Sequence, residues 1–247
     1  MALRYPKPPL VEAVFELFVP GDGGDWTPET EARLESALAK QFDGPRETVR
    51  PPGFQIQLAP AGPVARSMQS ELARRRLWTS DLGEMFQFSP SMCAYNLLGH
   101  YRNFEQHAGT LESLVRLFLE QRRPEGIGWA GQRYVNRIRV PVEAGDPATF
   151  FEIYPKVPSG QHRPFAMQIL SGEFEGGQVM LNLVFQGAQG GMATYVLDIY
   201  ARSSVGLRPD PAGIRSWHEA AHVQVRRSFE GALTEKTKAL FQGGGTP

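Results

Sequence analysis

The clearest structural signal in the sequence is Val11-Glu12-Ala13-Val14-Phe15-Glu16-Leu17-Phe18-Val19, near the start of the chain. Apolar side chains recur at every second position, and Glu12 and Glu16 lie on the opposite side. A period of two predicts a β-strand with one buried and one polar face. We therefore expect the chain to be built around a sheet.

Helices and strands are expected to alternate outward from this strand. Thr27 followed by Pro28 predicts a helix start, because a hydroxyl side chain caps a helix and proline fits its first position. The apolar pattern predicts a second helix over residues 111–122 and strands near residues 54–58, 77–101 and 134–140. Strand, helix, strand, strand, helix, strand is the order of a ferredoxin-like unit, which we predict for residues 1–142.

The second half of the chain is rich in expected strands. Residues 151–154, 165–174, 179–185 and 195–200 are joined by short glycine-containing turns, which favour an antiparallel meander. Asp210 and Pro211 then predict the start of one long helix that ends at Gly243. The predicted fold class is α+β with mainly antiparallel sheet: a ferredoxin-like first half, then a β-meander plus long C-terminal helix over residues 143–247, packed as one compact unit.

The charge balance limits the classes of partner. The 247 residues include 26 Lys and Arg against 26 Asp and Glu, so the formal net charge is zero. This excludes binding to nucleic acid or to anionic membranes through net charge alone, but it does not exclude a local basic patch. The single cysteine cannot form an intramolecular disulfide. No signal peptide and no apolar run of 18 residues is recognisable, so we expect a cytoplasmic protein without membrane association.

One motif points to metal chemistry. His218-Glu219-Ala220-Ala221-His222 matches H-E-x-x-H, in which two histidines one helical turn apart bind zinc and the glutamate activates a water. A third ligand does not follow at the usual spacing. Glu230 and Glu235 are expected on the same helix, and His162 or Glu173 would have to approach from elsewhere. We therefore expect that the protein has no cofactor, and zinc is the alternative. If the motif does not bind zinc, its two histidines are explained as residues of the core.

Two further patterns favour structural explanations. The segment Gly126-Ile127-Gly128-Trp129-Ala130-Gly131 matches G-x-G-x-x-G, but it follows an expected helix and precedes an expected strand, which is the reverse of a dinucleotide site. Cys93 lies in an apolar run, where a free cysteine behaves as a small buried hydrophobic residue.

Arginines suggest a contact surface. Arg133, Arg137 and Arg139 share one face of an expected strand, and Arg74, Arg75 and Arg76 are consecutive. Trp78 and Tyr134 are suited to stacking on bases. These arginines are our candidates for contact with nucleic acid or a protein partner; the alternative is a solvated face that pairs with carboxylates.

Four segments resemble a sporadically distributed bacterial and archaeal family of uncharacterised proteins of about 250 residues. They are Pro8-Pro9-Leu10-Val11-Glu12-Ala13-Val14-Phe15-Glu16-Leu17, Arg133-Tyr134-Val135-Asn136-Arg137-Ile138, Leu197-Asp198-Ile199-Tyr200 and Phe229-Glu230-Gly231-Ala232-Leu233-Thr234-Glu235-Lys236. The resemblance carries no activity, ligand or catalytic residue. The patchy distribution of the family implies an accessory function related to defence or to mobile elements.

No complete catalytic constellation is recognisable in the sequence, so the leading hypothesis is a non-enzymatic binding or assembly module that acts through protein partners or self-association. Two alternatives stay open. One is a zinc-dependent hydrolase that uses His218, Glu219 and His222, and the other is an RNA or single-stranded DNA binding protein that uses the arginines.

Overall fold

A computed structural model gives the fold of the chain. It describes residues 5–21, 26–50, 73–99, 101, 103–144, 146–154 and 166–242, together with the backbone of residues 52–59 and 62–69. Within these residues, none of the helices has the length and apolar character needed to cross a membrane.

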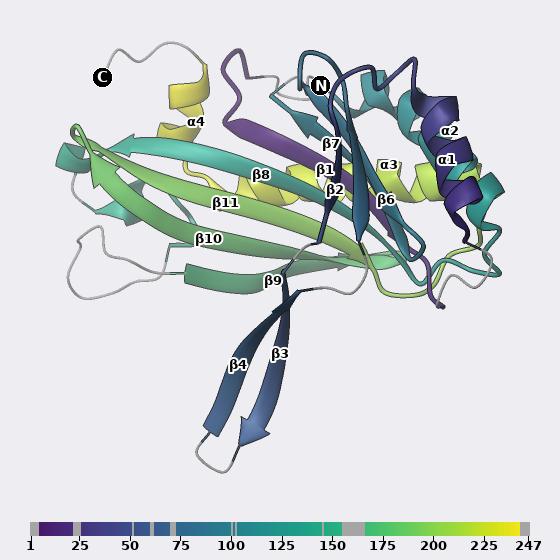
Figure 1. The fold of residues 1–247 in the computed structure, drawn as a ribbon. Coiled ribbons are helices and arrows are strands. Elements are labelled where there is room, and N and C mark those ends of the chain that lie inside the picture. The colour runs from purple at the N-terminus through teal and green to yellow at the C-terminus, as the bar shows by residue number, and fades with distance from the viewer. Residues whose placement is uncertain are drawn as a thin grey trace.

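Nine strands form one sheet in the order β2-β5-β6-β7-β1-β8-β11-β10-β9 (Figure 1). Each neighbouring pair is antiparallel. The hairpin of β3 and β4 forms a separate two-stranded sheet. The strands are β1 (Leu10–Phe18), β2 (Arg46–Val49), β3 (Pro52–Ala59), β4 (Gly62–Gln69), β5 (Arg74–Trp78), β6 (Glu84–Ser89), β7 (Met92–Leu98), β8 (Trp129–Pro141), β9 (Ala166–Phe174), β10 (Gly177–Gln189) and β11 (Met192–Ser203).

The predicted α+β class with mainly antiparallel sheet is confirmed. In the first half, β1, α1 (Pro28–Leu38), β6, β7, α2 (Phe104–Arg122) and β8 come in this order along the chain, with β2 to β5 between α1 and β6, and their strands lie in the sheet order β8-β1-β7-β6. This is a ferredoxin-like arrangement, which β5 and β2 extend at the β6 side. The expected strand near residues 54–58 is not part of it, because β3 lies in the separate hairpin and both strands between the two helices of the unit, β6 and β7, come from residues 84–98. The second half supplies the meander of β9, β10 and β11, followed by the long helix α3 (Pro211–Ala232).

Apart from the additional edge strand β2, the strand order is symmetrical about the pair of β1 and β8. On one side lie β7, β6 and β5, followed by β2, and on the other lie β11, β10 and β9. Each half therefore contains a central strand, a meander of three strands and a helix after the meander, and the two helices α2 and α3 pack against each other. The first half has α1, β2 and the hairpin of β3 and β4 in addition. Because β8 pairs with both β1 and β11, the sheet is continuous across residue 142.

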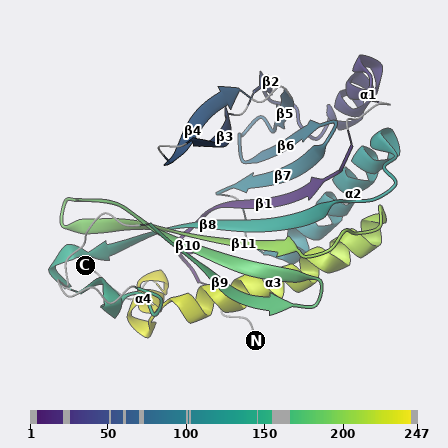
Figure 2. The same cartoon turned by 90° about the horizontal axis from the view of Figure 1, so that it is seen from below.

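Helices α1, α2 and α3 lie along one face of the sheet (Figure 2). Each begins at a polar cap whose side chain accepts a hydrogen bond from a backbone N–H of the first turn: Thr27, Asn103 and Asp210. The alternating residues Ala13, Phe15 and Leu17 of β1 are buried beneath these helices in the main core. The other face of β1 contributes to a separate small cluster of Val14, Met92 and Ala94.

Two predicted elements differ in the structure. Residues 151–154 do not form a strand, because Phe151 makes only an isolated bridge to Leu233 and a turn follows. The predicted single C-terminal helix is interrupted at the buried Leu233, whose backbone is extended, and Thr234 caps the new helix α4 (Glu235–Phe241). Glu230 and Glu235 consequently lie on different helices.

Candidate functional site

Five of the six candidate arginines lie on the sheet face opposite α1, α2 and α3, which we call the helix-free face. Side chains alternate along a strand. On β5, Leu77 is buried in the core, so Arg74 and Arg76 lie on the helix-free face with Trp78. On β8, Tyr134, Ile138 and Val140 belong to the core. Because side chains alternate along β8, Arg133, Arg137 and Arg139 lie on the helix-free face.

Arg75 points to the opposite side of the sheet. Its Nε lies 2.5 Å from Glu35 Oε1 and 3.0 Å from Glu31 Oε1, and both carboxylates belong to α1. Arg75 also donates a hydrogen bond to Thr48. The structure thus separates Arg75 from Arg74 and Arg76, and gives it a role in holding α1 against the edge of the sheet.

Polar side chains connect strands across the helix-free face. On one side, Gln87 of β6 donates a 3.1 Å hydrogen bond to Asn96 of β7, which donates a 2.7 Å bond to Glu12 of β1. On the other side, Arg133 of β8 donates two 2.8 Å hydrogen bonds to Asp198 of β11. Asn182 of β10 donates a 3.4 Å bond to the same carboxylate. Together these residues form a polar stripe across six neighbouring strands.

A carboxyl group lies among arginines near the middle of this face. Burial raises the pKa of Glu16, whereas a hydrogen bond to Tyr200 and the charges of Arg133, Arg74 and Arg202 act in the opposite direction. The side chains of Glu16 and Tyr200 meet above Gly131, where an added Cβ would lie 2.7 Å from Glu16 Oε1 and 2.7 Å from the Tyr200 hydroxyl. Gly131 therefore leaves the space in which a carboxyl from β1 reaches a hydroxyl from β11.

Several buried polar atoms on the helix-free face have no hydrogen-bond partner among the residues that the structure describes. They are Arg76 Nε, Trp78 Nε1 and Gln87 Oε1. Arg76 of β5 and Gln87 of β6 are paired in register. Burial also lowers the pKa of Arg74, against the effect of Glu16. Unpaired buried polar groups are costly, and two of the three are donors that need an acceptor.

Aromatic rings lie at one end of the same face. Phe18 of β1 and Trp129 of β8 stack with 5.6 Å between ring centroids and an interplanar angle of 12°. The guanidinium carbon of Arg202 lies 4.8 Å from the Trp129 ring centroid. This cross-strand row combines flat rings with a cation, which is the combination that stacks on nucleobases.

The central strands of this face carry an excess of cations. From β5 to β10 in the sheet order, its side chains include six arginines and three carboxylates: Arg74, Arg76, Arg133, Arg137, Arg139 and Arg202 against Glu12, Glu16 and Asp198. Glu47 and Glu173 lie on the two edge strands. Within the described ranges, Arg74, Arg76, Arg137, Arg139 and Arg202 form no ion pair within 4 Å. The face thus presents a local basic patch in a chain of zero formal net charge.

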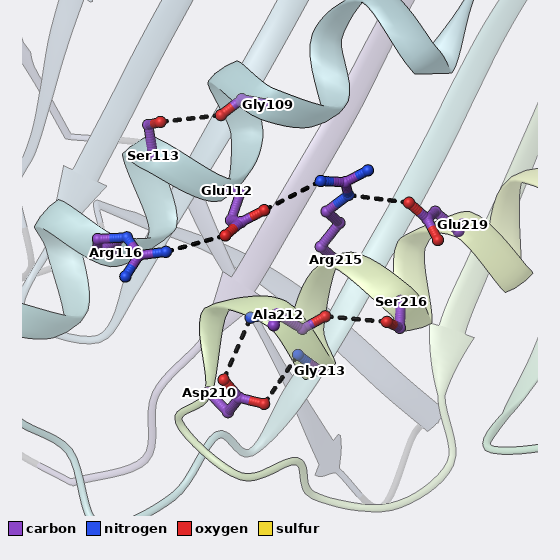
Figure 3. Close-up of polar contacts among 10 residues, drawn as sticks. All are labelled: Gly109, Glu112, Ser113, Arg116, Asp210, Ala212, Gly213, Arg215, Ser216 and Glu219. Atoms are coloured by element: carbon purple, nitrogen blue, oxygen red, sulfur yellow. Dashed lines mark hydrogen bonds and ion pairs between the residues drawn. The ribbon is translucent and has the colours of Figure 1, made fainter.

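The histidine motif is divided between three environments. His218 is fully buried, its Nδ1 lies 3.2 Å from Gln132 Oε1, and its Nε2 has no partner in the described part of the chain. His222 Nδ1 lies 2.8 Å from the Tyr134 hydroxyl. Glu219 forms a 2.9 Å ion pair with Arg215, which also binds Glu112 of α2 at 3.2 Å (Figure 3).

Burial favours the neutral form of both histidines. It lowers the pKa of His218 to about 3 and lowers that of His222. The two imidazoles engage different partners and Glu219 is on the exposed side of α3. No group of three or more His, Cys, Asp or Glu that could hold a metal ion occurs among the described residues. His162 lies outside the described residues, and Glu173 is on the edge strand β9.

The remaining motifs have structural roles. Gly126 and Gly128 lie in the connection before β8, and Gly131 lies within that strand. Cys93 is buried in the main core, where burial raises the pKa of its thiol. Sequence reasoning missed Glu16, Tyr200 and Arg202, which come from β1 and β11 and meet only through strand pairing.

No protein-family model and no curated protein matches the chain. Among solved structures, two similar ones are of the S. pombe Pct1 RNA triphosphatase, one of them in complex with the Spt5 CTD. The structure of the complex shares 8% identity over 96% of this chain and 86% of that chain. The other shares 10% identity over 95% and 82%. Both have a TM-score of 0.14.

Proposed function

We propose that the chain is a non-enzymatic binding module that holds single-stranded RNA or DNA on its helix-free face. The observation that carries this proposal is the excess of arginine over carboxylate on that face, beside buried donors that lack acceptors among the described residues. Phosphate oxygens supply both the negative charge and the acceptors that the exposed guanidinium groups of this face need.

The aromatic row favours a single strand over a duplex. Unpaired bases expose their ring faces, and each base can stack on an aromatic side chain or an arginine plane. Trp129 lies next to Arg202 at the end of the face, and Arg137 and Arg139 follow along the same strand. A strand that runs along β8 would place bases near Trp129 and phosphates near these arginines.

The carboxylates on the face position cations. Asp198 holds the Arg133 guanidinium through two of its N–H groups, and the remaining N–H groups can reach a phosphate. A positioned guanidinium loses less side-chain entropy on binding than a free one. This supports a ligand site and distinguishes Arg133 from Arg137 and Arg139, which have no ion pair within the described ranges.

The test measures the fluorescence anisotropy of labelled 20-nucleotide oligo-dT and oligo-U at low salt. We expect the double variant Arg137→Ala, Arg139→Ala to bind about tenfold more weakly, since each lost phosphate contact removes counterion release. The matched control is Arg116→Ala, Arg227→Ala, which removes two exposed arginines from α2 and α3. It should bind as the wild type does.

Two outcomes would overturn the proposal. One is the absence of binding to either oligonucleotide at about 50 mM NaCl, where phosphate contacts are strong. The other is an equal loss of affinity in both double variants, because the helix-free face would then have no special role. In either case an acidic protein partner would become the better explanation of the arginines.

A further inference from the structure

A cavity of about 460 Å³ lies on the other side of the sheet, away from the helix-free face. Its wall is formed by the segment before β1, the start of α2, the strand β8 and the second half of α3. Three of the four segments that carry the family resemblance contribute to it, through Pro8 and Pro9, Tyr134 and Asn136, and Phe229 and Glu230. Local sequence patterns do not predict this cavity, because its wall combines segments far apart along the chain.

Hydrogen-bonded side chains form the floor of the cavity. The Tyr134 hydroxyl lies 2.5 Å from the Tyr101 hydroxyl and 2.8 Å from His222 Nδ1, and it accepts a 3.0 Å hydrogen bond from Gln132 Nε2. Tyr134 is only 7% exposed. His222 also stacks on Phe104, with 5.4 Å between ring centroids and an interplanar angle of 19°. The floor is therefore fixed before any ligand enters.

His222 is a ready hydrogen-bonding group in this floor. Burial lowers its pKa, against the effect of Glu105, so the imidazole is neutral at pH 7. Whichever of the Tyr101 and Tyr134 hydroxyls donates to the other, His222 Nδ1 forms a hydrogen bond with the Tyr134 hydroxyl. Nε2 is then the nitrogen that remains for a ligand.

The rim of the cavity combines aromatic rings with an excess of negative charge. The rings of Tyr5 and Phe229 pack edge to face at 6.2 Å, and the Tyr5 hydroxyl donates a 2.8 Å hydrogen bond to Glu230. The lining carries two carboxylates, Glu105 and Glu230, against one guanidinium, Arg226. Two charged residues lie next to this lining: Lys238 is 4.0 Å from Glu230 and 2.7 Å from Glu235. The lysine and Glu235 cancel each other, so the formal charge of the lining stays at minus one when both are included.

We propose that this cavity is a binding site for a small organic cation, an aromatic or aliphatic body that carries a protonated amine. Tyrosine and phenylalanine faces attract cations, and the two carboxylates supply acceptors and charge. The prolines and rings cover the apolar body, and His222 supplies a directed hydrogen bond on the floor. A volume of this size lies in the usual range for small-molecule sites.

Three indoles of nearly equal shape test the class of ligand. Isothermal titration calorimetry of the full chain would compare tryptamine, which is a cation, with the neutral indole-3-ethanol and the anion indole-3-acetate. We expect tryptamine to bind at least about fivefold more tightly than the other two, in line with the weak energies of exposed charge pairs. Equal binding of the three, tighter binding of the anion, or no heat from any of them at millimolar concentration would overturn the proposal.

Variants then locate the site. The double variant Glu105→Gln, Glu230→Gln keeps the shape of the lining and removes its two carboxylates, so the preference for tryptamine should disappear. Glu120→Gln removes an exposed carboxylate elsewhere on α2 and should leave the preference unchanged. A preference that survives in the double variant would place the ligand elsewhere and overturn the assignment. The test is independent of nucleic-acid binding, which involves the other face.

Discussion

Arg133 and Asp198 form a bidentate ion pair between neighbouring strands. The Nε atom and one terminal nitrogen of the guanidinium each lie 2.8 Å from a carboxylate oxygen. The Asp198 side chain is 12% exposed and the Arg133 side chain 48% exposed. The pair thus anchors a cation that faces solvent on a nearly buried carboxylate. This relationship links the stability of the sheet to the charge of its helix-free face.

The pair should contribute measurably to stability. A double-mutant cycle with Arg133→Ala and Asp198→Ala should give a coupling free energy of about 1 kcal/mol. The bidentate geometry strengthens the ion pair, whereas solvent around the half-exposed Arg133 weakens it. Urea unfolding of the four proteins measures this coupling. A coupling of zero would mean that the contact contributes nothing in solution.

A side chain at Gly131 should displace the side chains of Glu16 and Tyr200 and so destabilise the fold. In Gly131→Ala the new Cβ would lie 2.7 Å from both Glu16 Oε1 and the Tyr200 hydroxyl, so we expect a loss of about 1–3 kcal/mol in the free energy of unfolding. Gly109→Ala, on α2, is the matched control, since its Cβ meets no described atom within 4 Å. Alanine favours helices over glycine, so the control should gain up to about 1 kcal/mol. Equal effects of the two changes would show that the space above Gly131 is not tight.

Acidic pH should strengthen nucleic-acid binding through Glu16. Burial raises the pKa of this carboxyl despite Tyr200, Arg133, Arg74 and Arg202, so it gains a proton at a higher pH than an ordinary glutamate. Protonation removes a negative charge from the face, so oligonucleotide affinity should rise as the pH is lowered from about 7.5 towards about 5 at constant ionic strength. Glu16→Gln should bind tightly at both pH values. A variant that keeps the full pH dependence of the wild type would rule Glu16 out as its source.

His218 should make the fold sensitive to acid. Its pKa is lowered to about 3 by burial, whereas a histidine in the unfolded chain has an ordinary pKa near 6.5. Between these values the unfolded chain binds a proton that the folded chain excludes, so stability falls as pH decreases, by up to about 1.4 kcal/mol per pH unit. Urea unfolding of the wild type and His218→Gln at pH 7, 6 and 5 compares the slopes. The variant should be less sensitive to acid, and identical slopes would show that His218 is not buried in its neutral form.

Much of the fold could be predicted from local patterns. The alternation in residues 11–19 and the capping residues Thr27 and Asp210 mark elements that the structure confirms, because these signals depend only on neighbouring residues. The break at Leu233 could not be predicted in this way. Leu233 continues an apolar helical pattern, and its burial against Phe151 is a tertiary contact that overrides it.

The candidate site could be predicted only in part. Alternation along β8 placed Arg133, Arg137 and Arg139 together, and the same rule applied to β5 would have separated Arg75 from Arg74 and Arg76. The meeting of Glu16 with Tyr200 and Arg202 depends on which strands are neighbours and on their register. Neither is encoded in a local pattern, so this part of the site required the structure.

The salt dependence of oligonucleotide affinity tests the central claim most directly. Each arginine that neutralises a phosphate of a single strand contributes about 0.7 to the slope of log affinity against log salt concentration. We predict that the slope for oligo-dT falls by about 1.4 in Arg137→Ala, Arg139→Ala and stays at the wild-type value in Arg116→Ala, Arg227→Ala. An unchanged slope in the first variant would contradict the assignment of nucleic-acid binding to the helix-free face.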